Sequence, residues 1–73
     1  MTTPILTFAT THHALWAEEL ARTHGVPAEI VPAPAEANAR CGLALQTLPD
    51  ELDRLCALLR AEAVPFAVHR PGG

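Results

Sequence analysis

Hydrophobic and polar positions along the chain fall into two kinds of pattern, short apolar runs and stretches with helical spacing. The short runs predict strands at residues 5–8, 28–31, 42–47 and 66–69. The two stretches with helical spacing lie between the first and second runs and between the third and fourth. Their apolar positions are Ala14, Ala17, Leu20 and Ala21, then Leu52, Leu55, Cys56 and Leu59. The predicted order is strand–helix–strand–strand–helix–strand.

Residues that favour helix ends flank both helical stretches. Thr10 and Thr11 are both good N-cap residues for the first helix. Gly25 suits the left-handed position that follows a helix, and Pro27 prevents the helix from resuming. Pro49 opens the second helix with acidic residues behind it, where they meet the positive end of the helix dipole.

The two halves of the chain echo one another. A shift of 38 residues places Ile5 on Leu43 and Ala17 on Leu55, and it places the dipeptide 26–27 (Val-Pro) on the identical dipeptide 64–65. Two such strand–helix–strand units interleave in the ferredoxin-like sandwich. The sequence therefore predicts an α+β fold with a four-stranded antiparallel sheet and both helices on one face.

The length of 73 residues allows one domain over residues 1–73, with an ordered core at about 4–70 and a tail at 71–73. A core this small gains from a partner subunit, so we expect a homodimer through the open face of the sheet.

Composition and charge exclude several classes of function. The chain has no Ser and no Lys, which excludes a serine nucleophile, a Schiff-base lysine and a phosphate-binding P-loop lysine. A net charge of −3 with five Arg gives no basic stripe for nucleic acid. No apolar run approaches the ~20 residues of a membrane span. The first residues carry no signal-peptide pattern, so we expect a cytoplasmic protein with reduced thiols and no cofactor.

The predicted topology gathers polar residues at one end of the sheet. The first strand ends there, the first helix starts there, and the loop from Pro32 to Arg40 leads there into the third strand. Cys41, which opens that strand, should then lie near four residues at the helix start: Thr10, Thr11, His12 and His13.

Cys41 is the sharpest candidate for chemistry. Free N–H groups at the helix start, together with Arg40 and a protonated His12 or His13, would lower the thiol pKa and favour the nucleophilic thiolate. The alternative is that Cys41 is a small apolar packing residue at the start of a strand. Cys56, by contrast, shares the apolar stripe of the second helix, and we expect it to be core packing.

Two other features have alternative interpretations. His12, His13 and Cys41 could bind a metal, but adjacent helical residues do not face the same way, and we favour the interpretation that the pair is two polar residues in the first turn of a helix. Trp16 stands on or beside the apolar stripe of the first helix. It is predicted to lie at the core edge or in a subunit contact.

Several segments together resemble one known family. They are F-A-T-T-H-H-A-L-W-A at 8–17, G-V-P at 25–27, V-P-A-P at 31–34 and C-G-L-A-L at 41–45. With the P-x-x-L-x-x-L pattern of the second helix, they resemble the small bacterial family of selenium/sulfur carrier-like proteins over residues 5–69. The chain departs from the family at Ala39 and Arg40, where small hydroxyl residues are frequent, and at Ala63, where Gly is common.

The resemblance implies that Cys41 is a carrier thiolate, with Arg40, Gly42, Thr11 and His12 in support. It would accept sulfur or selenium as a persulfide or selenosulfide and transfer it between donor and acceptor proteins. The protein would then be a covalent carrier and not a turnover enzyme. The alternative is a small ferredoxin-like regulatory or metal- or metabolite-binding module that uses His12, His13 and Cys41.

Overall fold

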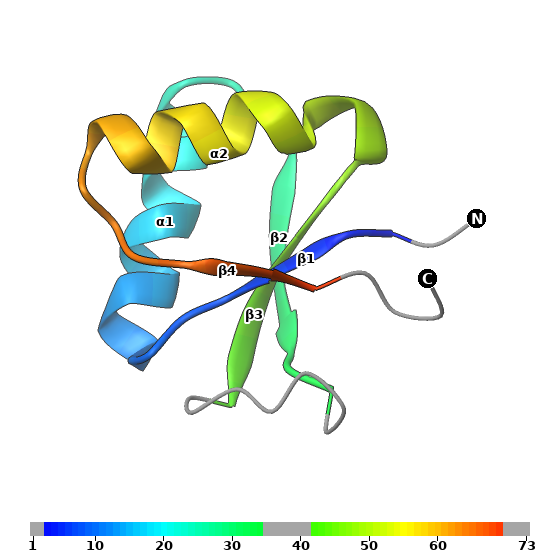
Figure 1. Ribbon diagram of the computed structural model, residues 1–73, viewed down its shortest axis with the longest axis vertical. Helices are drawn as coiled ribbons and strands as arrows, with labels where there is room; N and C mark the ends of the chain where they lie inside the picture. Colours follow the sequence, from blue (N-terminus) through cyan, green and yellow to red (C-terminus); the bar gives the residue numbers. More distant parts are fainter. Residues whose placement is uncertain (1–2, 35–41, 70–73) are drawn as a thin grey trace.

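A computed structural model describes residues 3–34 and 42–69, which form one sheet and two α-helices (Figure 1). The strands are β1 (Ile5–Thr7), β2 (Ala28–Pro32), β3 (Leu43–Thr47) and β4 (Ala67–His69). The helices are α1 (Thr11–Thr23) and α2 (Leu52–Ala61), and the short 3₁₀ helix η2 (Pro49–Glu51) leads into α2. The order of elements is the predicted one.

The sheet has the order β2-β3-β1-β4, and every neighbouring pair is antiparallel. The register pairs Leu6 of β1 with Leu45 of β3 on one side and with Val68 of β4 on the other. Figure 1 shows both helices on the same side of the sheet, with no helix on the other side. The predicted α+β, ferredoxin-like arrangement is confirmed.

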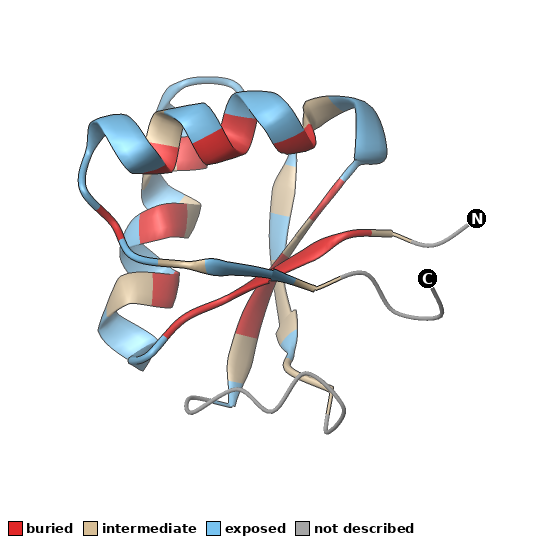
Figure 2. Cartoon of the chain, viewed as in Figure 1, coloured by how far each residue is buried: buried red, intermediate tan, exposed pale blue. Residues whose placement is uncertain are grey.

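The core lies between the sheet and the two helices, as the buried positions in Figure 2 show. Leu6 and Leu45 are fully buried at the centre of the sheet and face the helices. The helices fill the remaining space differently. From α1 come Ala14, Ala17 and Ala21, and from α2 come Leu52, Leu55, Cys56 and Leu59.

The two helices end in the same way, 38 residues apart. Gly25 follows α1 with φ +70°, and Ala63 follows α2 with φ +59°. The closing hydrogen bonds correspond pair by pair: Val26 N donates to Ala21 O at 2.8 Å and Val64 N donates to Leu59 O at 2.9 Å. The echo in the sequence is therefore an echo in the backbone, with a Schellman-type ending in each half.

A few boundaries differ from the prediction. Phe8 and Phe66 lie just outside β1 and β4, although Phe8 is buried and Phe66 packs on the core. The second helix begins as a 3₁₀ turn in which Glu51 N donates to Leu48 O at 2.9 Å, and α-helical bonding starts at Leu52. Short 3₁₀ turns at α-helix N-termini are common. The predicted loop at 35–40 and tail at 71–73 lie outside the described residues, and the predicted domain limits stay predictions.

Pro32 is accommodated because β2 is an edge strand. Ala33 N donates to Gly42 O at 2.9 Å, so Ala33 points its backbone toward β3. Neighbouring residues of a strand point their backbone groups in opposite directions, so Pro32 points away from the sheet. A proline at this position removes an N–H group from the free edge and leaves the ladder intact.

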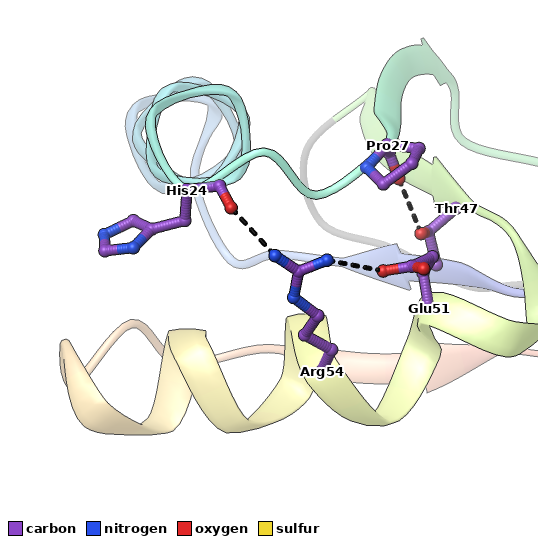
Figure 3. A network of polar contacts seen from close by, with 5 residues as sticks. All are labelled: His24, Pro27, Thr47, Glu51 and Arg54. Atoms are coloured by element: carbon purple, nitrogen blue, oxygen red, sulfur yellow. Dashed lines mark hydrogen bonds and ion pairs between the residues drawn. The ribbon is translucent and has the colours of Figure 1, made fainter.

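Polar contacts tie the two halves together at one end of the sheet (Figure 3). Arg54 of α2 donates to the carbonyl of His24, which caps the C-terminus of α1, at 3.0 Å and to Glu51 Oε1 at 3.1 Å. Thr47 Oγ1, at the end of β3, donates to the carbonyl of Pro27 at 2.7 Å. We call this the buttressed end.

Candidate functional site

The opposite end of the sheet collects the residues that the sequence singled out. There β1 ends, α1 starts, β2 ends and β3 starts, since Thr7 pairs with Ala44 and Pro32 pairs with Leu43 (Figure 1). We call it the site end. The predicted meeting of these element ends is confirmed. Cys41 and Arg40 lie outside the described residues, so their predicted position beside Thr11 and His12 stays a prediction.

The N-terminus of α1 forms one wall of the site end. Thr10 caps the helix: it has extended backbone angles (φ −138°, ψ 154°), and its Oγ1 accepts a hydrogen bond from His13 N at 3.1 Å. The first turn contains no acidic side chain, so no carboxylate offsets the positive partial charge of the helix end. Thr11 and His12 are exposed there.

The ring of His13 contacts the Thr10 cap, and the ring of His12 is separate from it. The hydroxyl of Thr10 lies 3.0 Å from His13 Nδ1, a contact that fixes the ring against the cap. The rings of His12 and His13 are 6.1 Å apart and inclined by 58°. Within residues 3–34 and 42–69, no group of three or more His, Cys, Asp or Glu side chains could hold a metal ion. The alternative set of His12, His13 and Cys41 includes a residue outside that part of the chain.

Gly42 forms the other side of the site end, at the entrance to β3. It is exposed, its carbonyl accepts the hydrogen bond from Ala33, and its φ lies outside the left-handed region. A Cβ at Gly42 would meet no atom of residues 3–34 or 42–69 within 4 Å, its chain neighbours aside. Neither backbone conformation nor the described neighbours therefore require glycine here.

Cys56 is part of the core, as predicted. It is only 6% exposed and packs in the cluster of α2, near Val68 of β4. A buried cysteine of this kind acts as a small apolar residue. At 6% exposure, Cys56 offers little surface to a protein partner.

The sequence predicts Trp16 at the core edge or in a subunit contact, and it gives no prediction for Leu15. In the structure Trp16 is 37% exposed and Leu15 is 50% exposed. The 38-residue echo could have indicated their exposure, since it places Leu15 and Trp16 on Asp53 and Arg54, which are charged and exposed.

No helix within the described residues has the length and apolarity needed to cross a bilayer. Comparison with curated proteins finds no match, and comparison with solved structures finds none. The profile of one protein family, described as "Putative Se/S carrier protein-like", matches residues 3–69. That match spans both helices, all four strands and the site end. The chain therefore belongs to this Se/S carrier-like family.

Proposed function

We propose that this protein carries sulfur or selenium covalently on Cys41 and transfers it between donor and acceptor proteins in the cytoplasm. The family match over residues 3–69 supports a carrier. One observation supports the choice of residue. The chain has two cysteines, and the burial of Cys56 in the core makes Cys56 the poorer candidate for transfer.

The transfer needs no external oxidant. The Cys41 thiolate attacks the terminal sulfur of a donor persulfide, R–S–SH. A new S–S bond forms at Cys41, the donor S–S bond breaks, and the donor leaves as its thiolate, R–S⁻. With R–S–SeH the same step forms an S–Se bond at Cys41. Delivery reverses the step, as an acceptor thiolate attacks the terminal atom and Cys41 returns to the thiolate.

The site end favours a thiolate on physical grounds. The α1 N-terminus carries a positive partial charge with no acidic side chain in its first turn. Thr11 and His12 are exposed beside it, and Arg40 directly precedes Cys41 in the chain. Gly42 adds no side chain next to the reacting sulfur. In this proposal Cys41 is the nucleophile, and Arg40, Gly42, Thr11 and His12 support it.

Mass spectrometry tests the proposal directly. The reduced protein is incubated with sodium polysulfide, or with a cysteine desulfurase and L-cysteine, and the intact mass is measured without reductant. We expect a gain of one sulfur atom that dithiothreitol reverses. A selenocysteine lyase with L-selenocysteine should add one selenium atom if the protein carries selenium.

Two cysteine variants form the matched pair for that experiment. Cys41→Ala should lose the added atom completely, and Cys56→Ala should keep it. Wild-type protein that stays unmodified with every donor would contradict the proposal. Loading on Cys56 would show that the carrier residue is misassigned.

A further inference from the structure

The outer surface of α1 carries an apolar pair that the core does not use. Leu15 and Trp16 are 50% and 37% exposed, and with His12 and Glu19 they line one shallow hollow. These four residues follow the spacing i, i+3, i+4, i+7, so they lie on one face of the helix. We call them the α1 patch.

The fold does not require apolar residues at these positions. The helix of the other half ends as α1 does, and a shift of 38 residues places Asp53 and Arg54 of α2 where α1 has Leu15 and Trp16. Asp53 is exposed, and Arg54 makes the contacts of the buttressed end. A helix in this position therefore folds with charged residues on its outer face, and the apolar pair on α1 needs another explanation.

The α1 patch starts at the site end. His12 belongs to the first turn of α1, next to the Thr10 cap, and the rest of the patch follows within two turns. Gly42, the chain neighbour of Cys41, lies at the same end of the sheet. A surface that binds a transfer partner must lie near the transferring sulfur, and the α1 patch begins at the end of the sheet where Gly42, the neighbour of Cys41 in sequence, lies.

Two carboxylates, those of Glu18 and Glu19, lie beside or within the patch. Glu19 is exposed, and no cation among the described residues lies within ion-pair distance of its carboxylate. Glu18 reaches Arg22 only at 3.9 Å, and the whole chain has a net charge of −3. A complementary surface would offer Arg or Lys side chains, which also bind over the face of an exposed tryptophan.

We propose that the α1 patch docks the persulfide-bearing donor enzyme, through an apolar side chain of that enzyme flanked by Arg or Lys. Two exposed apolar side chains are far from the roughly 1,000 Å² that a stable dimer interface buries, and a small contact suits a carrier that must leave each partner. This inference rests on the proposed function, because it assumes that Cys41 is loaded by a protein.

The test compares a protein donor with a small-molecule donor. The double variant Leu15→Asp/Trp16→Arg gives α1 the residues that α2 has at the same positions, so it should fold. The control is Leu48→Asp, which changes a leucine of similar exposure (54%) at the buttressed end. Sulfur transfer to Cys41 is followed by mass spectrometry from a cysteine desulfurase with L-cysteine and, separately, from sodium polysulfide.

We expect the double variant to slow transfer from the desulfurase about tenfold or more and to leave loading by polysulfide unchanged. Leu48→Asp should match wild type with both donors. Glu19→Lys should slow the protein donor several-fold, whereas Glu62→Lys, at the end of α2, should not. Trp16, the single tryptophan, can be replaced by 5-fluorotryptophan, and its one ¹⁹F resonance should shift when unlabelled desulfurase is added.

The outcomes separate the two proposals. Wild-type transfer rates from the desulfurase in the double variant, or a ¹⁹F resonance that does not move, would overturn the docking proposal. So would a wild type that loads from polysulfide but not from the desulfurase. A wild type that loads from neither donor would refute the carrier function itself, and the docking proposal with it.

Discussion

The two halves of this molecule, β1–α1–β2 and β3–α2–β4, end their helices in the same way. They differ in the side chains that the helices present to the core and to solvent. Both helices end at a left-handed residue followed by Val-Pro, with corresponding hydrogen bonds. Toward the core, α1 presents alanines and α2 presents leucines and a cysteine. Toward solvent, α1 presents Leu15 and Trp16, and α2 presents charged residues.

This difference distinguishes the positions that the fold constrains from the positions that can vary without loss of the fold. The end of each helix is repeated in sequence and in backbone, which identifies it as a requirement of the strand–helix–strand unit. Small core residues go with α1, whose backbone approaches β2 and β3, and larger ones go with α2. The outer face is constrained by neither, so apolar residues there are more informative about binding than apolar residues inside.

The largest effect should come from exchanging the core residues of the two helices. Leu55→Ala should lower the free energy of unfolding by about 3 kcal/mol, because it leaves a cavity in a fully buried position. Its counterpart Ala17→Leu should also destabilise, by about 1–3 kcal/mol, since Ala17 is fully buried and a larger side chain would overpack the core. Urea denaturation measures both. An Ala17→Leu protein as stable as wild type would show that the two helices are packed equally loosely.

The two cysteines allow a second test, on reactivity. We expect iodoacetamide to modify Cys41 with a pKa below the usual value of about 8.5. Cys56 should react about 100-fold more slowly, because it must wait for opening of the core. The helix end alone contributes roughly 0.3–1 kcal/mol, and one pKa unit corresponds to about 1.4 kcal/mol. A larger depression therefore needs Arg40 or a histidine, and Arg40→Ala should then raise the pKa.

The rates of iodoacetamide modification, measured from pH 5 to pH 9 on Cys56→Ala and on Cys41→Ala, report the two thiols separately. Faster modification of Cys56 than of Cys41, or a Cys41 pKa at or above the usual value, would show that the carrier site has been misplaced.

A third prediction concerns the contacts that join the halves. Thr47→Val keeps the shape of a buried side chain and removes the 2.7 Å hydrogen bond to Pro27 O. We expect a loss of about 1.5 kcal/mol in unfolding free energy. Arg54→Met should cost less, about 0.5 kcal/mol, because Arg54 and its ion pair with Glu51 are exposed. Equal losses would mean that the Arg54 contact with His24 O is as important as the buried bond.

Effects smaller than those in the core are expected at the helix ends, and they should have opposite signs. Gly25→Ala should destabilise by about 1 kcal/mol, because a Cβ is disfavoured at φ +70°. Ala63→Gly should stabilise by about the same amount, as it removes a Cβ from φ +59°. Thermal melts of both variants and of the double variant would check this. A destabilised Ala63→Gly protein would mean that flexibility in the unfolded chain outweighs the strain.

Most of the fold could be predicted because several local signals agree. The Thr10 cap, the Gly25 ending and the apolar spacing of both helices all gave the observed elements, and the echo gave the topology. The 3₁₀ start of the second helix was missed, since Pro49 fits the first turn of either kind of helix. In the site, the topology brought together the ends of the predicted elements, and the support of Cys41 by Thr11, His12 and Gly42 stays a prediction. The exposure of Leu15 was missed because apolar periodicity cannot tell a core stripe from a binding stripe.

The place of β1 in the sheet has a consequence for how the protein is made. β1 is the first strand to be synthesised, and it pairs with β3 on one side and with β4 on the other. Both partners follow it by more than thirty residues. The nascent chain therefore cannot complete its sheet until Ala67–His69 has left the ribosome. Until then the apolar residues of β1 lack one or both of their sheet partners.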